Sequence, residues 1–258
     1  MRVTRIAEDT FADSKSAKRE NPFHARPDLQ TIKTMLKLMF QFNDQDPEFH
    51  RFASQCSLDF FTRNKMILSH GAYSDHIYVI VDGIIKIFRS STQGKRTTYA
   101  FLRKGQLLPE LNPLFKIPHG FSAIALMDTV CLKIPYSVFF NIFLHRQTAT
   151  LWLISQLTKF QEQISEWKLI RFDRVEIKIA RLFLEMSKDS NLVKSDNKTT
   201  MIIVPLTRKD IAEVIDSTVE TVIRIIQKWR KKGILHVRAK IFSILDINEI
   251  RKIAEIAS

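Results

Sequence analysis

Residues 206–240 read LTRKDIAEVIDSTVETVIRIIQKWRKKGILHVRAK, and their periodicity predicts two short helices joined by a turn. Thr207 can cap the first helix, and Asp210 places a carboxylate in its positive first turn. The run Asp-Ser-Thr at 216–218 interrupts the apolar pattern with residues that favour turns and caps. The second helix is expected from Val219 to Lys232 and ends before Gly233, which adopts a left-handed C-cap most easily.

This second helix has one apolar and one polar face. The polar face carries Glu220, Arg224, Gln227, Lys228 and Lys231. A solvated surface is the ordinary explanation for such a stripe. However, a helix-turn-helix places its second helix in the DNA major groove, where Arg can bind guanine and Glu can accept from cytosine. Residues 206–240 also hold nine Lys or Arg against four Asp or Glu, so we predict a DNA-reading helix.

Two short strands are expected after the helix, at residues 234–237 and 241–244, around Arg238-Ala239-Lys240. A helix-turn-helix followed by such a basic hairpin is a winged helix. The basic residues around the second helix are suited to phosphates. The predicted DNA backbone contacts are Thr207, Arg208, Thr218, Lys228, Arg230, Lys231, Lys232, Arg238 and Lys240.

Residues 207–233 resemble the C-terminal domain of the Crp/Fnr family, the cyclic-AMP receptor and fumarate–nitrate regulators of bacterial transcription. The sequence TVETVIR at 218–224 is most similar to the fumarate–nitrate branch. That branch reads a TTGAT-like half-site with Glu and Arg at the positions of Glu220 and Arg224. The cyclic-AMP branch has Arg where this chain has Val219, and Ile223 replaces a small residue, which leaves one base pair open. The predicted base contacts are Glu220, Thr221, Ile223 and Arg224.

The middle of the chain is rich in short β-type runs separated by turn residues. The runs are 65–69, 77–81, 84–89, 97–102, 107–108, 123–125 and 129–134. They predict a jelly-roll, and residues 77–83 with Gly94 and Gly105 resemble the cyclic-nucleotide-binding β-roll of the same family. The expected fold class is α+β. Its parts are a flexible extension (1–27), a β-roll sensor domain with flanking helices (28–147), a dimerisation helix (148–171) and a winged helix-turn-helix domain (172–258).

The effector pocket that this resemblance implies is degenerate. The family marks its pocket with Gly-Glu-Leu, whose Glu binds ribose, and with Arg-Ser/Thr-Ala, whose Arg binds the cyclic phosphate. Here these elements read Pro109-Glu110-Leu111 and Phe121-Ser122-Ala123, so Phe121 replaces the phosphate-binding Arg. His119 could add charge only below neutral pH. The degenerate pocket is expected at Glu110, Leu111, Phe121, Ser122, Ala123, Gln163 and Ile164.

These substitutions predict a regulator that cyclic AMP does not gate. An apolar or other non-nucleotide effector, or no effector, agrees better with the pocket, and the effector is left unidentified. The alternative is a cyclic-nucleotide- or haem-responsive regulator that uses a non-standard pocket.

A long helix over residues 148–171 carries apolar residues at alternating spacings of four and three. A coiled-coil seam has this spacing, although a helix packed on its own domain also shows one stripe. Leu151 and Ile154 add apolar surface beside the seam. In the family this helix is the dimer axis, so the expected dimer interface is Leu153, Leu157, Phe160, Ile164 and Trp167.

Composition agrees with a nucleic-acid partner. The 258 residues carry a net charge of +13, which favours nucleic acid or an anionic membrane. We expect a cytoplasmic protein with no membrane partner, because no leader and no run of 18 apolar residues occurs. The expected partners are double-stranded DNA, RNA polymerase and a second copy of the chain.

Other classes of protein find little support. There is no P-loop, GxSxG or zinc motif, so we predict that the chain is not an enzyme. No pair among the seven histidines has HxxxH or HExxH spacing. Cys56 and Cys131 are expected to be buried thiols, and two cysteines exclude a four-cysteine iron–sulfur cluster. We therefore predict no metal and no cofactor.

Overall fold

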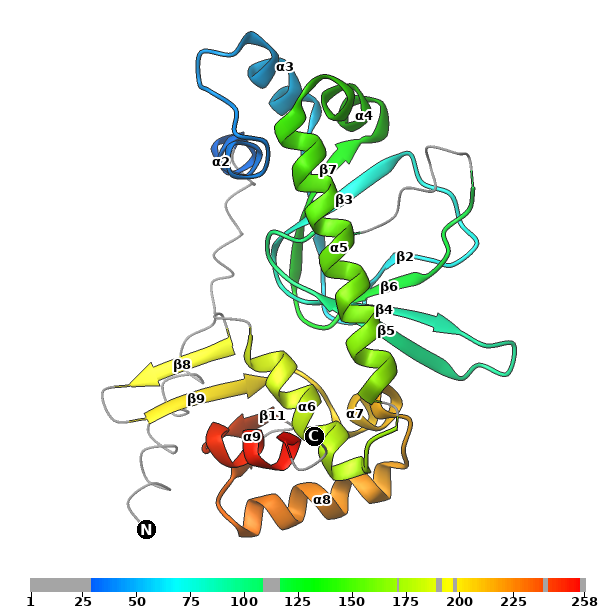
Figure 1. Cartoon of the computed structure of the whole chain (residues 1–258), viewed down its shortest axis with the longest axis vertical. Helices are drawn as coiled ribbons and strands as arrows, with labels where there is room; N and C mark the ends of the chain where they lie inside the picture. The colour runs from blue at the N-terminus through cyan, green and yellow to red at the C-terminus, as the bar shows by residue number, and fades with distance from the viewer. Residues whose placement is uncertain are drawn as a thin grey trace.

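The computed structural model describes residues 29–108, 117–170, 172–188, 192–196, 199–238 and 241–255. The extension predicted at residues 1–27 lies outside them. The long helix α5 (Gln147–Ile170) runs alongside a β-roll, and a C-terminal part lies at its C-terminal end, as Figure 1 shows. The C-terminal part, from α6 to α9, is here called the head.

The β-roll consists of two facing antiparallel sheets, in agreement with the expected fold class. Their strands are β1 (Ser57–Phe61), β2 (Met66–Leu68), β3 (His76–Asp82), β4 (Ile85–Ser90), β5 (Arg96–Leu102), β6 (Ser122–Ala125) and β7 (Thr129–Pro135). The sheet orders are β1-β7-β3 and β2-β6-β4-β5. Helices α2 (Leu29–Phe40), α3 (Pro47–Gln55) and α4 (Tyr136–His145) lie at the end away from the head.

Strand β1 was missed by the sequence reading, which began the first strand at Lys65. Its sequence SLDFF does not alternate cleanly, and the strand is exposed or half-buried along its whole length. Pairing with β7 makes it a strand, since Ser57 to Phe61 lie opposite Lys133 to Thr129. The predicted short strand at residues 107–108 is only a single bridge from Leu107 to Val79.

The turn after β3 requires glycine. Gly83 has φ +100°, and a Cβ added there would lie 2.4 Å from the Thr129 hydroxyl and 2.8 Å from the Thr129 Cα. Because one of these atoms is backbone, the clash cannot be relieved by rotating a side chain. We expect Gly83→Ala to lower the free energy of unfolding by about 1–3 kcal/mol. Urea unfolding of Gly83→Ala beside Gly94→Ala, a left-handed turn position with open space, separates the clash from the φ preference alone.

The head is a winged helix. Its elements are α6 (Val175–Ser187), β8 (Val193–Asp196), β9 (Thr199–Val204), α7 (Arg208–Ile215), α8 (Val219–Lys231), β10 (Leu235–Arg238), β11 (Ile241–Ile244) and α9 (Ile247–Glu255). The strands form one sheet in the order β10-β11-β9-β8. Trp229 of α8 is fully buried between Phe183 and the rest of the head core. The polar sequence at 187–200 predicts a loop, but it contains β8, which becomes a strand by pairing with β9.

The two ends of the seam predicted on helix α5 are buried within the chain itself. Leu153 is 4% exposed and belongs to the core that packs α2, α3 and α4 on the β-roll. Trp167 is 6% exposed and belongs to the core shared with the head. Leu157 and Phe160 also pack against the chain's own clusters. Much of the stripe therefore serves intramolecular packing, which corrects Leu153 and Trp167 as interface residues, whereas Leu157, Phe160 and Ile164 are half-buried and their place in a dimer interface stays a prediction. The exposed apolar residues of α5 are Leu151 (59%) and Ile154 (54%).

Both cysteines are free and buried, as predicted. Burial raises the pKa of the Cys56 thiol to about 12, which keeps it protonated and unreactive at neutral pH. Among the described residues, no helix has the length and apolarity needed to cross a membrane.

Candidate nucleic-acid interface

The first helix of the predicted helix-turn-helix is capped as expected. The Thr207 hydroxyl accepts from the Asp210 N–H at 3.1 Å, and the Asp210 carboxylate accepts from the Thr207 N–H at 2.7 Å. This reciprocal capping box satisfies two N–H groups at the start of α7. At the other end, Asp216 is left-handed with φ 54°, which turns the chain sharply toward α8.

Helix α8 begins and ends where the sequence indicates. The Thr218 side chain accepts from the Thr221 N–H at 3.2 Å, and the two threonine hydroxyls lie 3.0 Å apart. Gly233 has φ +74° directly after the helix, in agreement with the predicted left-handed position. The hydroxyls of Thr218 and Thr221 therefore hold the first turn of α8, and their DNA contacts stay a prediction.

The outer face of α8 is accessible along its full length. Glu220, Arg224, Gln227 and Lys231 are all exposed and share one face, whereas Val222, Ile225, Ile226 and Trp229 are buried. Ile223 is half-buried at the edge of that face. These four exposed residues are here called the reading face. Gln227 was left out of the predicted base contacts, although its i+7 spacing from Glu220 was the signal for including it.

Lys228 forms an ion pair within the head that the sequence did not indicate. Its Nζ donates to both carboxylate oxygens of Glu176 at 2.8 and 2.9 Å, and the Trp229 indole N–H donates to the same group at 2.8 Å. Burial would raise the pKa of Glu176, but these hydrogen bonds outweigh it and the pKa lies below its usual value. The ionised Glu176 thus ties α8 to α6. Lys228 thus helps to position the helix, and its predicted contact with the DNA backbone stays a prediction.

Arg208 also has a contact within the head, and its predicted contact with the DNA backbone stays a prediction. Its guanidinium lies over the Phe242 ring, 5.6 Å from the centroid, and the residue is only half-exposed. Arg230, Lys231 and Lys232 are exposed at the end of α8, and their contacts with phosphates stay a prediction. The side chains of Arg238 and Lys240 lie outside the described residues.

Side chains of the chain itself pack together where the effector pocket of the β-roll is predicted. Phe121 packs against Phe160 of α5 with ring centroids 6.1 Å apart, and both lie against the interior cluster of the roll. Ser122 is buried, where its hydroxyl accepts from the His70 N–H, and Ala123 is fully buried. Gln163 and Ile164 are half-buried on α5, while Glu110 and Leu111 lie outside the described residues.

His119 does not replace the missing arginine. The residue is 2% exposed, and burial lowers the pKa of its imidazole, which therefore carries no charge at neutral pH. Within the part of the chain that the structure describes, no group of three or more His, Cys, Asp or Glu side chains could hold a metal ion.

Comparison with known proteins covers both parts of the chain. Residues 58–146 match the cyclic nucleotide-binding domain, and residues 177–253 match the Crp-like helix-turn-helix domain. The cAMP-activated global transcriptional regulator CRP of Salmonella typhimurium is 23% identical over 199 residues, which are 76% of this chain and 92% of that protein. The nitrogen fixation regulation protein FixK of Azorhizobium caulinodans is 24% identical over 182 residues, with 67% and 68% covered.

The solved structures agree in fold. FixK2 from Bradyrhizobium japonicum superposes with a TM-score of 0.67 at 18% identity, covering 79% of this chain and 99% of that one. The two domain matches occur in the same order on either side of a long helix, and together they take in more than half of the chain. The protein therefore belongs to the Crp/Fnr family of transcription regulators.

Proposed function

We propose that this regulator binds a pseudo-palindromic, TTGAT-like operator as a homodimer and that cyclic AMP does not gate it. The observation that carries the proposal is the reading face, which is exposed on a helix that Glu176 and the Thr218 cap hold in place. Arg224 can bind guanine O6 and N7 together, and Glu220 can accept from cytosine N4 one turn away on the same face. Gln227 can bind adenine in the same groove.

The proposal assigns different tasks to the residues around this face. Glu220, Thr221, Ile223 and Arg224 contact base edges, where Ile223 offers apolar contact to a thymine methyl group. Arg230, Lys231 and Lys232 hold phosphates and set the position of the helix in the groove. The chain acts on transcription through DNA and RNA polymerase and catalyses no reaction itself.

Selection of binding sites from random DNA tests the proposal. The full chain is expected to select a two-fold symmetric site with a G·C pair in each half. A selected motif without symmetry, or no selected motif at all, contradicts the proposal. Binding measured with and without cell extract then shows whether an effector adds to it.

The homodimer is proposed to form through the outward face of α5. Leu151 and Ile154 lie one turn apart and are more than half exposed, which is unusual for large aliphatic residues on a long helix. A two-fold axis along this face buries both residues of each copy and places two reading faces symmetrically. This face lies beside the seam first expected from the periodicity.

Cyclic AMP is expected to bind too weakly to raise DNA affinity. In the β-roll, Phe121 and Phe160 pack together near a missing phosphate ligand, and the nearby His119 is uncharged at neutral pH. Isothermal titration calorimetry of the full chain should show no heat at ligand concentrations that saturate the cAMP-activated relative from Salmonella typhimurium, run as positive control. Tight binding, or an increase in operator affinity with cyclic AMP, contradicts this part of the proposal.

A further inference from the structure

The surface between the β-roll and the head is segregated by charge. Residues 84–108 of the β-roll contain six Lys or Arg and no Asp or Glu. Four of these cations pair with carboxylates of the head, and Arg63 of the β-roll adds a fifth. The pairs are Lys86–Glu213 (2.5 Å), Arg96–Glu213 (3.7 Å), Lys95–Asp216 (2.9 Å), Arg103–Glu185 (2.9 Å) and Arg63–Asp210 (3.9 Å). These nine residues are here called the ionic dock.

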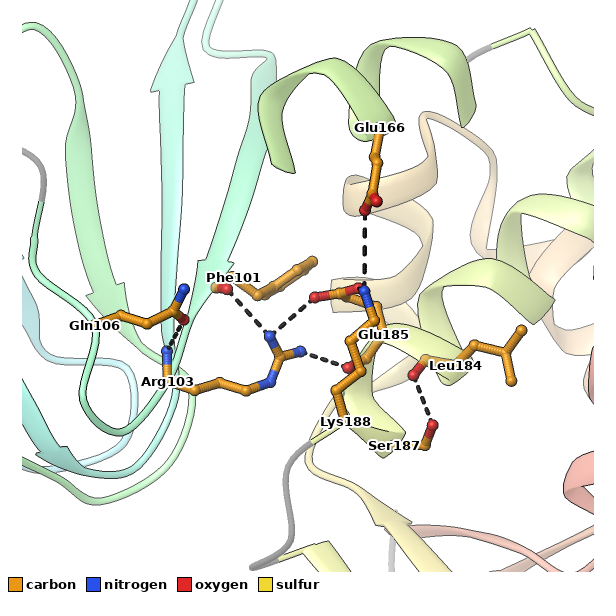
Figure 2. Close-up of polar contacts among 8 residues, drawn as sticks. All are labelled: Phe101, Arg103, Gln106, Glu166, Leu184, Glu185, Ser187 and Lys188. Atoms are coloured by element: carbon orange, nitrogen blue, oxygen red, sulfur yellow. Dashed lines mark hydrogen bonds and ion pairs between the residues drawn. The ribbon is translucent and has the colours of Figure 1, made fainter. Parts of the chain in front are cut away.

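The pair of Arg103 and Glu185 is buried and geometrically specific. The Arg103 guanidinium donates to the Glu185 carboxylate at 2.9 Å and to the Glu185 main-chain carbonyl at 2.5 Å. It also donates to the Phe101 carbonyl. Figure 2 shows Lys188 joining the same carboxylate to Glu166 of α5, so three elements meet at one point. Arg103 is 9% and Glu185 is 7% exposed.

An apolar centre lies within the same interface. Ile84, Phe101 and Leu126 of the β-roll belong to the core cluster of the head. The Phe101 ring packs edge-on against Trp167 of α5 with centroids 5.2 Å apart. Lys86 is 3% exposed, and its partner Glu213 also binds Arg96 of the β-roll.

The dock leaves the reading face open. Its head residues are on α6, on α7 and at the turn after α7, while Glu220, Arg224, Gln227 and Lys231 stay exposed. We infer that the ionic dock sets the orientation in which the head reads DNA. In an effector-gated regulator, binding of the effector would set this orientation. This inference rests on the proposed function, because it concerns how that reading face is aimed.

Paired charges can restrict the head to one orientation relative to the β-roll. Burying charges gains little stability over an apolar contact, but a buried charge whose partner moves away is left unpaired at a large penalty. Apolar contacts alone would allow the head to slide over the β-roll, whereas five ion pairs define one relative position of the two surfaces. If the docked orientation is the one that binds DNA, its population multiplies the operator affinity directly.

A charge swap at Lys86 and Glu213 tests this. Glu213 is partly exposed, so Glu213→Lys can fold while it faces Lys86 and Arg96 with a like charge. We expect the ratio of operator affinity to random-DNA affinity to fall about tenfold, which corresponds to one head in ten remaining docked. Lys86→Glu should act in the same direction, and the double variant Lys86→Glu/Glu213→Lys should restore the ratio to within about threefold of wild type. Small-angle scattering should show an expanded particle for Glu213→Lys and a compact one for the double variant.

The charge-matched control is Glu255→Lys, an exposed residue at the end of α9 and outside the dock. It should raise affinity for all DNA without lowering the ratio, because only net charge changes. An unchanged ratio in Glu213→Lys, or a double variant that restores nothing, overturns the inference. A wild-type chain that selects no operator contradicts the proposed function itself, and the scattering comparison then reports whether the dock holds the head independently of DNA.

Discussion

Arg224→Ala is expected to lower affinity for the selected operator by about 1–3 kcal/mol for each half-site, while affinity for random DNA changes little. The exposed guanidinium of Arg224 lies one turn from Glu220 on the reading face, where it can form two hydrogen bonds to one guanine. Loss of a bidentate base contact removes discrimination at that base pair and leaves the phosphate contacts intact. A dimer loses this contribution twice, so the effect exceeds that of any single phosphate ligand.

The matched control is Lys231→Ala, on the same face near the end of α8. As a phosphate ligand, Lys231 should contribute about equally to operator and random DNA, and its loss should reduce the salt dependence by about one unit. Affinities are best measured by fluorescence anisotropy at several salt concentrations. Equal losses on both kinds of DNA for Arg224→Ala show that another element enters the groove.

Leu151→Asp combined with Ile154→Asp is expected to convert a micromolar dimer into a monomer. Both side chains are more than half exposed, so the substitution leaves the cores of the single chain intact. In a dimer the same change buries four carboxylates without partners, which strongly opposes association. Operator affinity should then fall by about 10²–10⁴, because the second half-site no longer binds at high effective concentration.

Analytical ultracentrifugation gives the oligomeric state, and circular dichroism checks folding. Leu29→Asp combined with Leu38→Asp is the control, since these exposed leucines lie on α2, away from the outward face of α5. That control should remain dimeric. A wild-type monomer at micromolar concentration, or a double α5 variant that stays dimeric, removes the proposed axis. Asp at Leu157 is a poorer test, because Leu157 packs against its own core and its replacement can unfold the monomer.

The two helices and their turn could be predicted in detail because local chemistry decides them. Thr207 and Asp210 cap each other within one turn, Thr218 caps the next helix, and Gly233 ends it. Each of these interactions joins residues only a few positions apart, so spacing alone identifies them. The reading face follows from the same logic, since helical periodicity states which side chains share a side.

The prediction of a degenerate nucleotide pocket rests on residue type. A phosphate site needs a cation, and Phe121 is apolar whatever its surroundings. The structure adds that the Phe121 ring packs against Phe160 of the long helix α5. The strands β1 and β8 could not be predicted from their own residues, which lack a clear strand pattern. They form because β7 and β9 supply their hydrogen-bond partners.

The sequence by itself therefore determined the winged helix and the polar side of its second helix, since both depend on residue type and short-range spacing, and from residue type alone it predicts a degenerate phosphate site at Phe121. Only the tertiary structure decided which stripe of α5 faces inward, because a heptad repeat has the same form against a partner and against its own domain. It alone also showed that Lys228 is held by Glu176, and that Arg103 and Lys86 meet Glu185 and Glu213. These partners lie 52, 82 and 127 residues apart in the sequence. Because no spacing rule connects charges at such separations, their pairing cannot be predicted before the fold is known.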